Sequence, residues 1–169
     1  METRRLSATE KVTITLPEEL YKAIENYIKQ QHEYTNIPDF LSCACKYFCL
    51  RFAYDIEPQI NEKITEYAHK KQIVEKISFV SEYSGESVSK QSTMASGIIS
   101  NMHSLVSTYP HLDYSNILRY SPEFYYNSIM KSRDITAVRY MEKYYDKKDV
   151  KEDFTPPVVR FECQTRDGS

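Results

Sequence analysis

The sequence predicts a mainly α-helical protein that opens with one short β-strand. Polar and apolar residues alternate strictly from residue 11 to residue 16 (KVTITL), which is the side-chain period of a strand. Much of the remaining chain places apolar residues three and four apart, the spacing of one helix face. A hydrophobic content of 41% with only three glycines favours a foldable, helix-rich chain.

The predicted strand has an apolar face and a polar face, because neighbouring side chains point to opposite sides. The apolar face carries Val12, Ile14 and Leu16, and the polar face carries Lys11, Thr13 and Thr15. Such a strand needs a partner, since unpaired edges are costly. The next forty residues read as helix, so we expect the same strand of a second chain to pair with it. An antiparallel ribbon with lysine and threonine outward fits the major groove of B-DNA.

Thr13 and Thr15 also have a simpler interpretation, since threonine favours strands and commonly faces water. Because they lie between Lys11 and Pro17, with two helices following, we favour contacts with DNA bases. Threonine hydroxyls donate to and accept from base edges, and lysine suits guanine. This hypothesis depends on pairing between two chains. A strand docked within its own chain, or one with Val12 and Ile14 pointing outward, would overturn the regulator that we predict from it.

Two helices are predicted directly after the strand. The first begins at Pro17, has acidic residues in its first turn, and should end between residues 31 and 33. The second is capped by Asn36 and runs from residue 37 to about residue 54. Residues 55–58 (DIEP) should then bend or break the helix, because a residue before proline disfavours helical geometry.

The order of strand, helix, short turn and helix resembles the ribbon-helix-helix family of DNA-binding proteins. The resemblance lies in KVTITLPEELYKAIENYI and YTNIPDFLSCACKYF and covers the first third of the chain. It implies an intertwined homodimer whose paired strands enter the major groove and read bases through Lys11, Thr13 and Thr15. It also implies phosphate contacts from the start of the second helix. The resemblance places those contacts on Asn36 and Ile37. Because Pro38 has no N–H donor, the phosphate site is either weaker or shifted onto Thr35 and Asn36.

The resemblance further implies a shared dimer core and a role for the N-terminal arm. The core residues expected from it are Val12, Ile14, Leu16, Ile24, Phe40, Leu41, Ala44 and Phe48. Arg4 and Arg5 form either a solvated tail or an arm that contacts DNA phosphate. We therefore divide the first part of the chain into a flexible arm (1–9) and a DNA-binding, dimerising domain (10–55).

Residues 56–149 are predicted as an all-helical C-terminal domain that oligomerises or binds a small-molecule or protein effector. We expect one long helix from about residue 60 to about residue 84, a second over 94–109, and a further helical region from residue 121. The fifteen tyrosines could line a pocket or an interface, or simply pack in the core. Residues 150–169 form either a flexible tail or a short strand near Val158–Phe161. No internal repeat is evident.

Charge argues mildly against a nucleic-acid partner, because the net charge is −2. Three cations gather at the proposed ribbon: Arg4, Arg5 and Lys11. A dimer would double their number. We therefore expect modest DNA binding with a shallow salt dependence. No apolar run is long enough to span a membrane, and the first fifteen residues hold no apolar stretch, so we expect a cytoplasmic protein.

The sequence shows no glycine-rich phosphate loop, nucleophile elbow or metalloprotease helix, so we do not expect an enzyme. Cys43, Cys45 and Cys49 share one predicted helix without the spacing of a metal site, and we expect no metal or cofactor. The function that the sequence predicts is a sequence-specific transcriptional regulator, a repressor, binding double-stranded DNA as a homodimer or tetramer. The alternative is a protein-interaction component with the same dimer, such as an antitoxin or a plasmid-partition adaptor.

Overall fold

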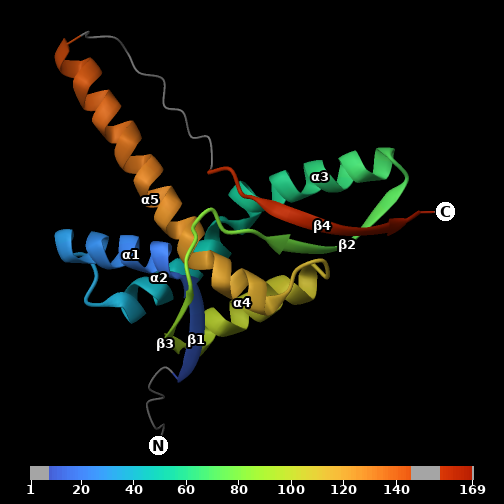
Figure 1. The fold of residues 1–169 in the computed structure, drawn as a ribbon, viewed down its shortest axis with the longest axis horizontal. Helices are drawn as coiled ribbons and strands as arrows, with labels where there is room; N and C mark the ends of the chain where they lie inside the picture. The colour runs from blue at the N-terminus through green and yellow to red at the C-terminus, as the bar shows by residue number, and fades with distance from the viewer. Residues whose placement is uncertain (1–7, 146–156, 169) are drawn as a thin grey trace, which may run out of the picture.

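The computed structural model of this chain describes residues 8–145 and 157–168, with side chains described over 8–132 and 157–168. Figure 1 shows a central body from which α5 extends in one direction and an arm of α3, β2 and β4 in another. The elements are β1 (Thr9–Pro17), α1 (Glu18–Gln30), α2 (Ile37–Arg51), a π-helical turn (Phe52–Ile56), α3 (Glu57–His69), β2 (Gln72–Phe79), β3 (Ser87–Ala95), α4 (Ser96–Thr108), α5 (Tyr114–Tyr145) and β4 (Phe161–Asp167).

Strand β1 pairs with β3 of its own chain, antiparallel, from Thr9 opposite Ala95 to Pro17 opposite Ser87. A second two-stranded antiparallel sheet joins β2 and β4. The predicted fold class is therefore wrong, since it had one strand in an intertwined homodimer, followed by an all-helical C-terminal domain. The pairing partner that the strand requires is supplied from seventy or more residues further along the chain.

The first two helices and the helix over 96–108 form close to the predicted positions. Asn36 caps α2 as expected, because its side-chain Oδ1 accepts a hydrogen bond from the Asp39 N–H at 2.9 Å. After α2 the chain continues through the π-helical turn into α3, with Pro58 in the first turn of α3. The expected break at residues 55–58 is thus a change of helix type.

The long helix predicted to reach residue 84 ends at His69, and β2 follows. Val74, Ile77 and Phe79 are the buried apolar residues of β2. Their spacing is uneven because the register with β4 shifts between Val74 and Lys76, as in a β-bulge. The extra residue disturbs the period of two, so the pattern mimics a helix face. The C-terminal stretch contains β4, which pairs with β2 along the arm in Figure 1.

Two parts of the chain repeat the same elements 78 residues apart. Strand β1 and helix α1 occupy residues 9–17 and 18–30, while β3 and α4 occupy residues 87–95 and 96–108. A second helix follows in each part, and we name β1, α1 and α2 the first repeat and β3, α4 and α5 the second repeat. Pro17 and Ala95, which join strand to helix, have nearly equal backbone angles, φ −61°, ψ 142° and φ −59°, ψ 135°.

Hydrogen bonds at the two ends of the β1–β3 ribbon follow the same repeat. The Glu18 N–H, at the start of α1, donates to the Glu86 carbonyl at 2.9 Å. The Ser96 N–H, at the start of α4, donates to the Ala8 carbonyl at 2.8 Å. Each first helix is therefore tied to the residue that precedes the opposite strand.

An approximate two-fold axis passes through the middle of the ribbon. Thr13 pairs with Gln91 in the register, and the two residues are also equivalent in the repeats. Between the strand and first helix of the two repeats, only Thr15 and Thr93 are identical in sequence. The absence of an internal repeat that we inferred from the sequence thus holds for residue identity and not for structure.

The core lies between the ribbon and the pair of second helices, α2 and α5. Ala44 of α2 and Ser121 of α5 are both fully buried, and the Tyr47 and Phe48 rings lie 5.8 Å from the Phe124 ring. Small residues allow helices to approach closely while aromatic rings fill the space on either side. Of the residues expected in a dimer core, Val12 is half-buried and the others are buried within a single chain: Ile14, Leu16, Ile24, Phe40, Leu41, Ala44 and Phe48.

Tyrosines contribute to this core along one side. The hydroxyl groups of Tyr34 and Tyr125 are hydrogen-bonded to each other, and the Tyr27 ring packs edge-on against Tyr126. Both interpretations of the tyrosines apply here: all four pack against the core, and Tyr27, Tyr34 and Tyr125 also line a cavity of about 430 Å³. Tyr140, Tyr144 and Tyr145 lie outside the described side chains.

Candidate nucleic-acid interface

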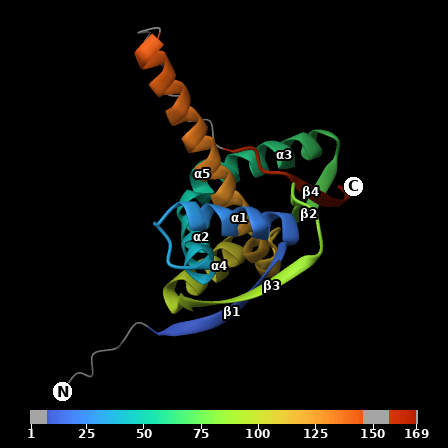
Figure 2. The same ribbon diagram turned by 60° about the vertical axis from the view of Figure 1, so that its left-hand side comes forward.

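The ribbon presents one continuous polar face, which we call the outer ribbon face. Figure 2 shows β1 and β3 side by side along one side of the molecule, with helices on the other side of the ribbon. Five of the six side chains of the face are exposed and Thr15 is half-buried. None is acidic and none is aliphatic. The outer ribbon face consists of Lys11, Thr13 and Thr15 of β1 and Ser89, Gln91 and Thr93 of β3.

The inner face of the ribbon packs on the helices, which fixes the outward direction of the polar side chains. Ile14, Leu16 and Met94 are at most 1% exposed. Two inner positions of β3 are polar, and both find partners. The Ser92 hydroxyl donates to the Pro38 carbonyl at 2.8 Å, and the Lys90 ammonium lies 5.1 Å from the centre of the Tyr21 ring. A one-residue slip would expose the apolar set and is therefore disfavoured.

The outer ribbon face can both donate and accept hydrogen bonds. Lys11 lies opposite Thr93, and Thr13 lies opposite Gln91. Lysine supplies donors only, whereas the hydroxyl and amide groups supply donors and acceptors. At the third pair, the Thr15 Oγ1 and Ser89 Oγ atoms are 3.1 Å apart and share a hydrogen bond. This combination of groups can contact base edges in a major groove.

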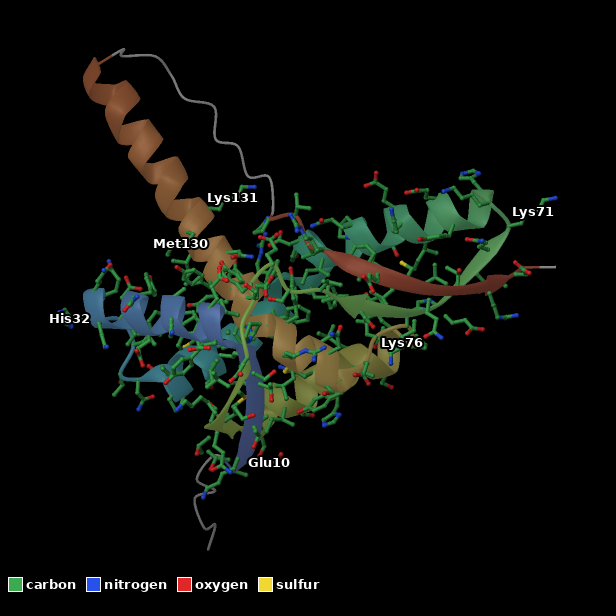
Figure 3. The ribbon with its side chains drawn as sticks, viewed as in Figure 1. Glu10, His32, Lys71, Lys76, Met130 and Lys131 are labelled. Carbon is green, nitrogen blue, oxygen red and sulfur yellow. The ribbon has the colours of Figure 1, made fainter. Side chains whose placement is uncertain are left out.

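Among the described residues, the cations near the ribbon other than Lys11 lie off its outer face, as Lys90 does on the inner face against the Tyr21 ring. Lys22 on α1 is paired with Glu18 at 2.9 Å, and its hydrogen bond with this carboxylate raises the pKa of the Lys22 ammonium. Glu10 is exposed at one tip of the ribbon, where Figure 3 labels it. Lys11 is therefore the cation of the outer ribbon face itself, and phosphate attraction at this face is modest.

The residues to which the resemblance assigns phosphate contacts, Thr35, Asn36 and Ile37, lie in the turn before α2 and at its first residue. The Thr35 N–H donates to Asp39 Oδ2 at 3.0 Å, and Asn36 caps the Asp39 N–H. A carboxylate thus occupies the position near these N–H groups that an anion would take. The geometry makes this turn a weaker phosphate site than an uncapped helix start.

The second repeat has the same arrangement before α5. Asp113, which precedes α5, accepts a hydrogen bond at its Oδ2 from the N–H of Asn116, the third residue of the helix, at 3.1 Å. Here the cap itself is acidic, so this helix start also repels phosphate. Arg4 and Arg5, the predicted N-terminal arm, lie outside the described residues.

A cavity of about 390 Å³ lies beside the end of the ribbon where β1 ends and β3 begins. Arg119 and Glu123 of α5 line it together with both strands. The Glu123 carboxylate accepts hydrogen bonds from the Ser81 hydroxyl and from the Glu82 N–H, the latter at 3.0 Å. Burial raises the pKa of Glu123, and these two hydrogen bonds oppose the rise.

The cysteines of α2 are poorly suited to bind a metal. Burial raises the pKa of Cys45 to about 12 and that of Cys49 to about 11, so both thiols hold their protons near neutral pH. Over residues 8–132 and 157–168, no three His, Cys, Asp or Glu side chains gather as a metal site. No helix in the described part of the chain is long and apolar enough to cross a membrane.

Half of the outer ribbon face was missed by the sequence analysis. Ser89, Gln91 and Thr93 were assigned to no site, because β3 (SVSKQSTMA) lacks the alternation that marks β1. Its inner positions include Lys90 and Ser92, so polar residues fall on both faces. The signal available in the sequence was the series of uncharged polar residues at every second position, Ser89, Gln91 and Thr93. Such a series is by itself typical of many loops.

The comparisons with known proteins add no family. No protein-family model matches the chain, and neither the curated proteins nor the solved structures gave a match.

Proposed function

We propose that the protein is a sequence-specific DNA-binding regulator, acting as a cytoplasmic repressor, that inserts the outer ribbon face into the major groove. The observation that carries this proposal is the sorting of the two faces of the β1–β3 ribbon. One face is packed on helices, and the other offers six side chains, none of them acidic, in a period-two array. A two-stranded ribbon has the width that the major groove admits.

The proposal no longer depends on pairing between two chains. The sequence predicted a regulator through that pairing, and this derivation is wrong, because the strand pairs within its own chain. What supports the present proposal is the ribbon that the single chain forms. The second strand of the ribbon comes from the second repeat, so the first and second repeats together act as the two halves of a ribbon-helix-helix unit in one polypeptide. A strand–helix–helix order in each repeat and an axis through the ribbon centre support this correspondence.

The affinity of this interface should come mainly from base contacts. Lys11 supplies the cation of the outer ribbon face, and the capped turns before α2 and α5 offer little phosphate attraction. With few phosphates neutralised, binding should fall slowly as salt rises. A small-molecule or protein effector would act on the ribbon most directly through the cavity beside it, because both strands line that cavity.

The proposal is tested with the full chain by selecting bound sequences from a random duplex pool and titrating the selected duplex by fluorescence anisotropy. Lys11→Ala should weaken binding to the selected duplex by about 5- to 150-fold, the range for loss of a base contact. The matched control is Lys76→Ala, since Lys76 is an exposed lysine on the arm, well away from the ribbon tip marked by Glu10 in Figure 3. Equal affinities for the two variants, or absence of duplex binding by the wild type, would refute the proposal.

The alternative is a protein-interaction component such as an antitoxin or a partition adaptor. Leu50 and Tyr54, near the end of α2, are 63% and 72% exposed, which is unusual for large apolar side chains. A stoichiometric protein partner that is lost in Leu50→Ser, together with absence of duplex binding, would favour this alternative.

A further inference from the structure

The two strands of the ribbon are related by an axis, but their outward side chains are not the same. The axis passes between Thr13 and Gln91, which face each other in the register and are 78 residues apart. A dimer of identical chains would have to place the same residue at both of these positions. A single chain is free of that requirement.

Two of the three related positions on the outer ribbon face differ in chemistry. Lys11 of the first repeat corresponds to Ser89 of the second, and Thr13 corresponds to Gln91, whereas Thr15 and Thr93 are equal. The differences lie on exposed side chains that do not support the core.

The two ends of the ribbon therefore offer different groups to DNA. One end carries Lys11 opposite Thr93, a cationic donor beside a hydroxyl. The other end carries Thr15 and Ser89, two hydroxyls already hydrogen-bonded to each other at 3.1 Å. Lysine favours the two acceptors of guanine, and glutamine favours the adenine edge, while hydroxyls accept either partner.

We infer that one chain binds one duplex site and that this site is non-palindromic, with a guanine preference in the half contacted by Lys11 and an adenine preference at the centre, near Gln91. This inference rests on the proposed DNA-binding function and specifies its substrate. A dimeric ribbon reads a symmetric site because the protein is symmetric. Here the backbone of the ribbon has approximate two-fold symmetry, whereas the outward side chains at related positions differ.

The test converts the outer ribbon face into a symmetric one. Ser89→Lys together with Gln91→Thr places Lys, Thr and Thr on both strands at related positions, and both changed residues are exposed. The matched control makes the same two changes in residue type elsewhere, as Ser107→Lys near the end of α4 and Gln164→Thr on β4, both exposed. The two double variants have the same net charge, and equal thermal midpoints check that both fold.

Bound sequences are selected from a random duplex pool for the wild type and both variants, and native mass spectrometry counts the chains per duplex. We expect an asymmetric sequence and one chain per duplex for the wild type and the control. The symmetric variant should prefer a palindromic sequence over the wild-type sequence by about 5- to 150-fold.

A palindromic wild-type sequence, two chains per site, or an unchanged preference in the symmetric variant would each overturn the inference while leaving DNA binding in place. Duplex binding without sequence preference would overturn it in the same way. Absence of any duplex binding would instead overturn the proposed function on which it rests.

Discussion

Replacement of Ile14 by alanine, measured at two protein concentrations, tests both the packing of β1 and whether the ribbon is folded within one chain. Ile14 is 1% exposed and lies on the inner face of β1, so the substitution removes three buried carbon atoms, at about 0.8 kcal/mol each, and leaves a cavity. We expect a loss of about 3 kcal/mol in the free energy of unfolding, within the ~2–5 kcal/mol typical of such changes. Thr13→Ala, one residue away on the outer face, should cost less than about 1 kcal/mol.

Urea unfolding followed by circular dichroism measures both variants, with the midpoint shifting and the slope unchanged. Each curve is recorded at two protein concentrations tenfold apart. A ribbon formed within the chain gives the same midpoint at both concentrations, whereas a ribbon shared by two chains gives a higher midpoint in the more concentrated sample. A concentration-dependent midpoint, or a loss below 1 kcal/mol for Ile14→Ala, would refute the packing described for β1.

Two further predictions concern groups away from the outer ribbon face. Burial raises the pKa of Glu123, so the folded state holds the carboxyl proton more tightly than the unfolded state does. The resulting contribution to the free energy of unfolding is complete below pH 4.5 and is lost as pH rises through the folded-state pKa. The difference in unfolding free energy between wild type and Glu123→Gln should therefore fall with pH above 4.5, and a constant difference across a urea series at several pH values would contradict this. Asn36→Ala removes the cap of α2 and should lower the free energy of unfolding by about 0.5–2 kcal/mol. Urea unfolding measures this loss, with Asn26→Ala, within α1, as the comparison variant. Equal effects of the two substitutions would argue against the cap.

The strand and two helices at the start of the chain could be predicted because the signals that specify them lie within a few neighbouring residues. The alternation of β1, the proline at its end and the Asn36 cap each act within a few residues, and the predicted β1, α1 and α2 lie within a few residues of those observed. The outward direction of Lys11, Thr13 and Thr15 follows from the same alternation, and it agrees with the exposure of Lys11 and Thr13, while Thr15 is half-buried.

The parts that could not be predicted depend on contacts far along the chain. Strand β3 is held by backbone pairing with β1, and its inner polar residues are satisfied by the Pro38 carbonyl and the Tyr21 ring, neither of which is near in sequence. Strand β2 is disguised by its bulge, and its end is fixed by Asn116, whose side chain bonds both the N–H and the carbonyl of Phe79. Tertiary context therefore overrode a helical reading of these residues.

Joining both strands of the ribbon in one polypeptide changes how its active form responds to dilution. A two-subunit assembly dissociates once its concentration drops below its own dissociation constant, so occupancy of its target then varies with the square of the copy number. The ribbon described here is assembled by an intramolecular folding reaction, which dilution does not reverse. Under the proposed function, with one chain per duplex site, occupancy of that site should vary with the first power of copy number, and a scarce protein of this design would respond in a graded manner.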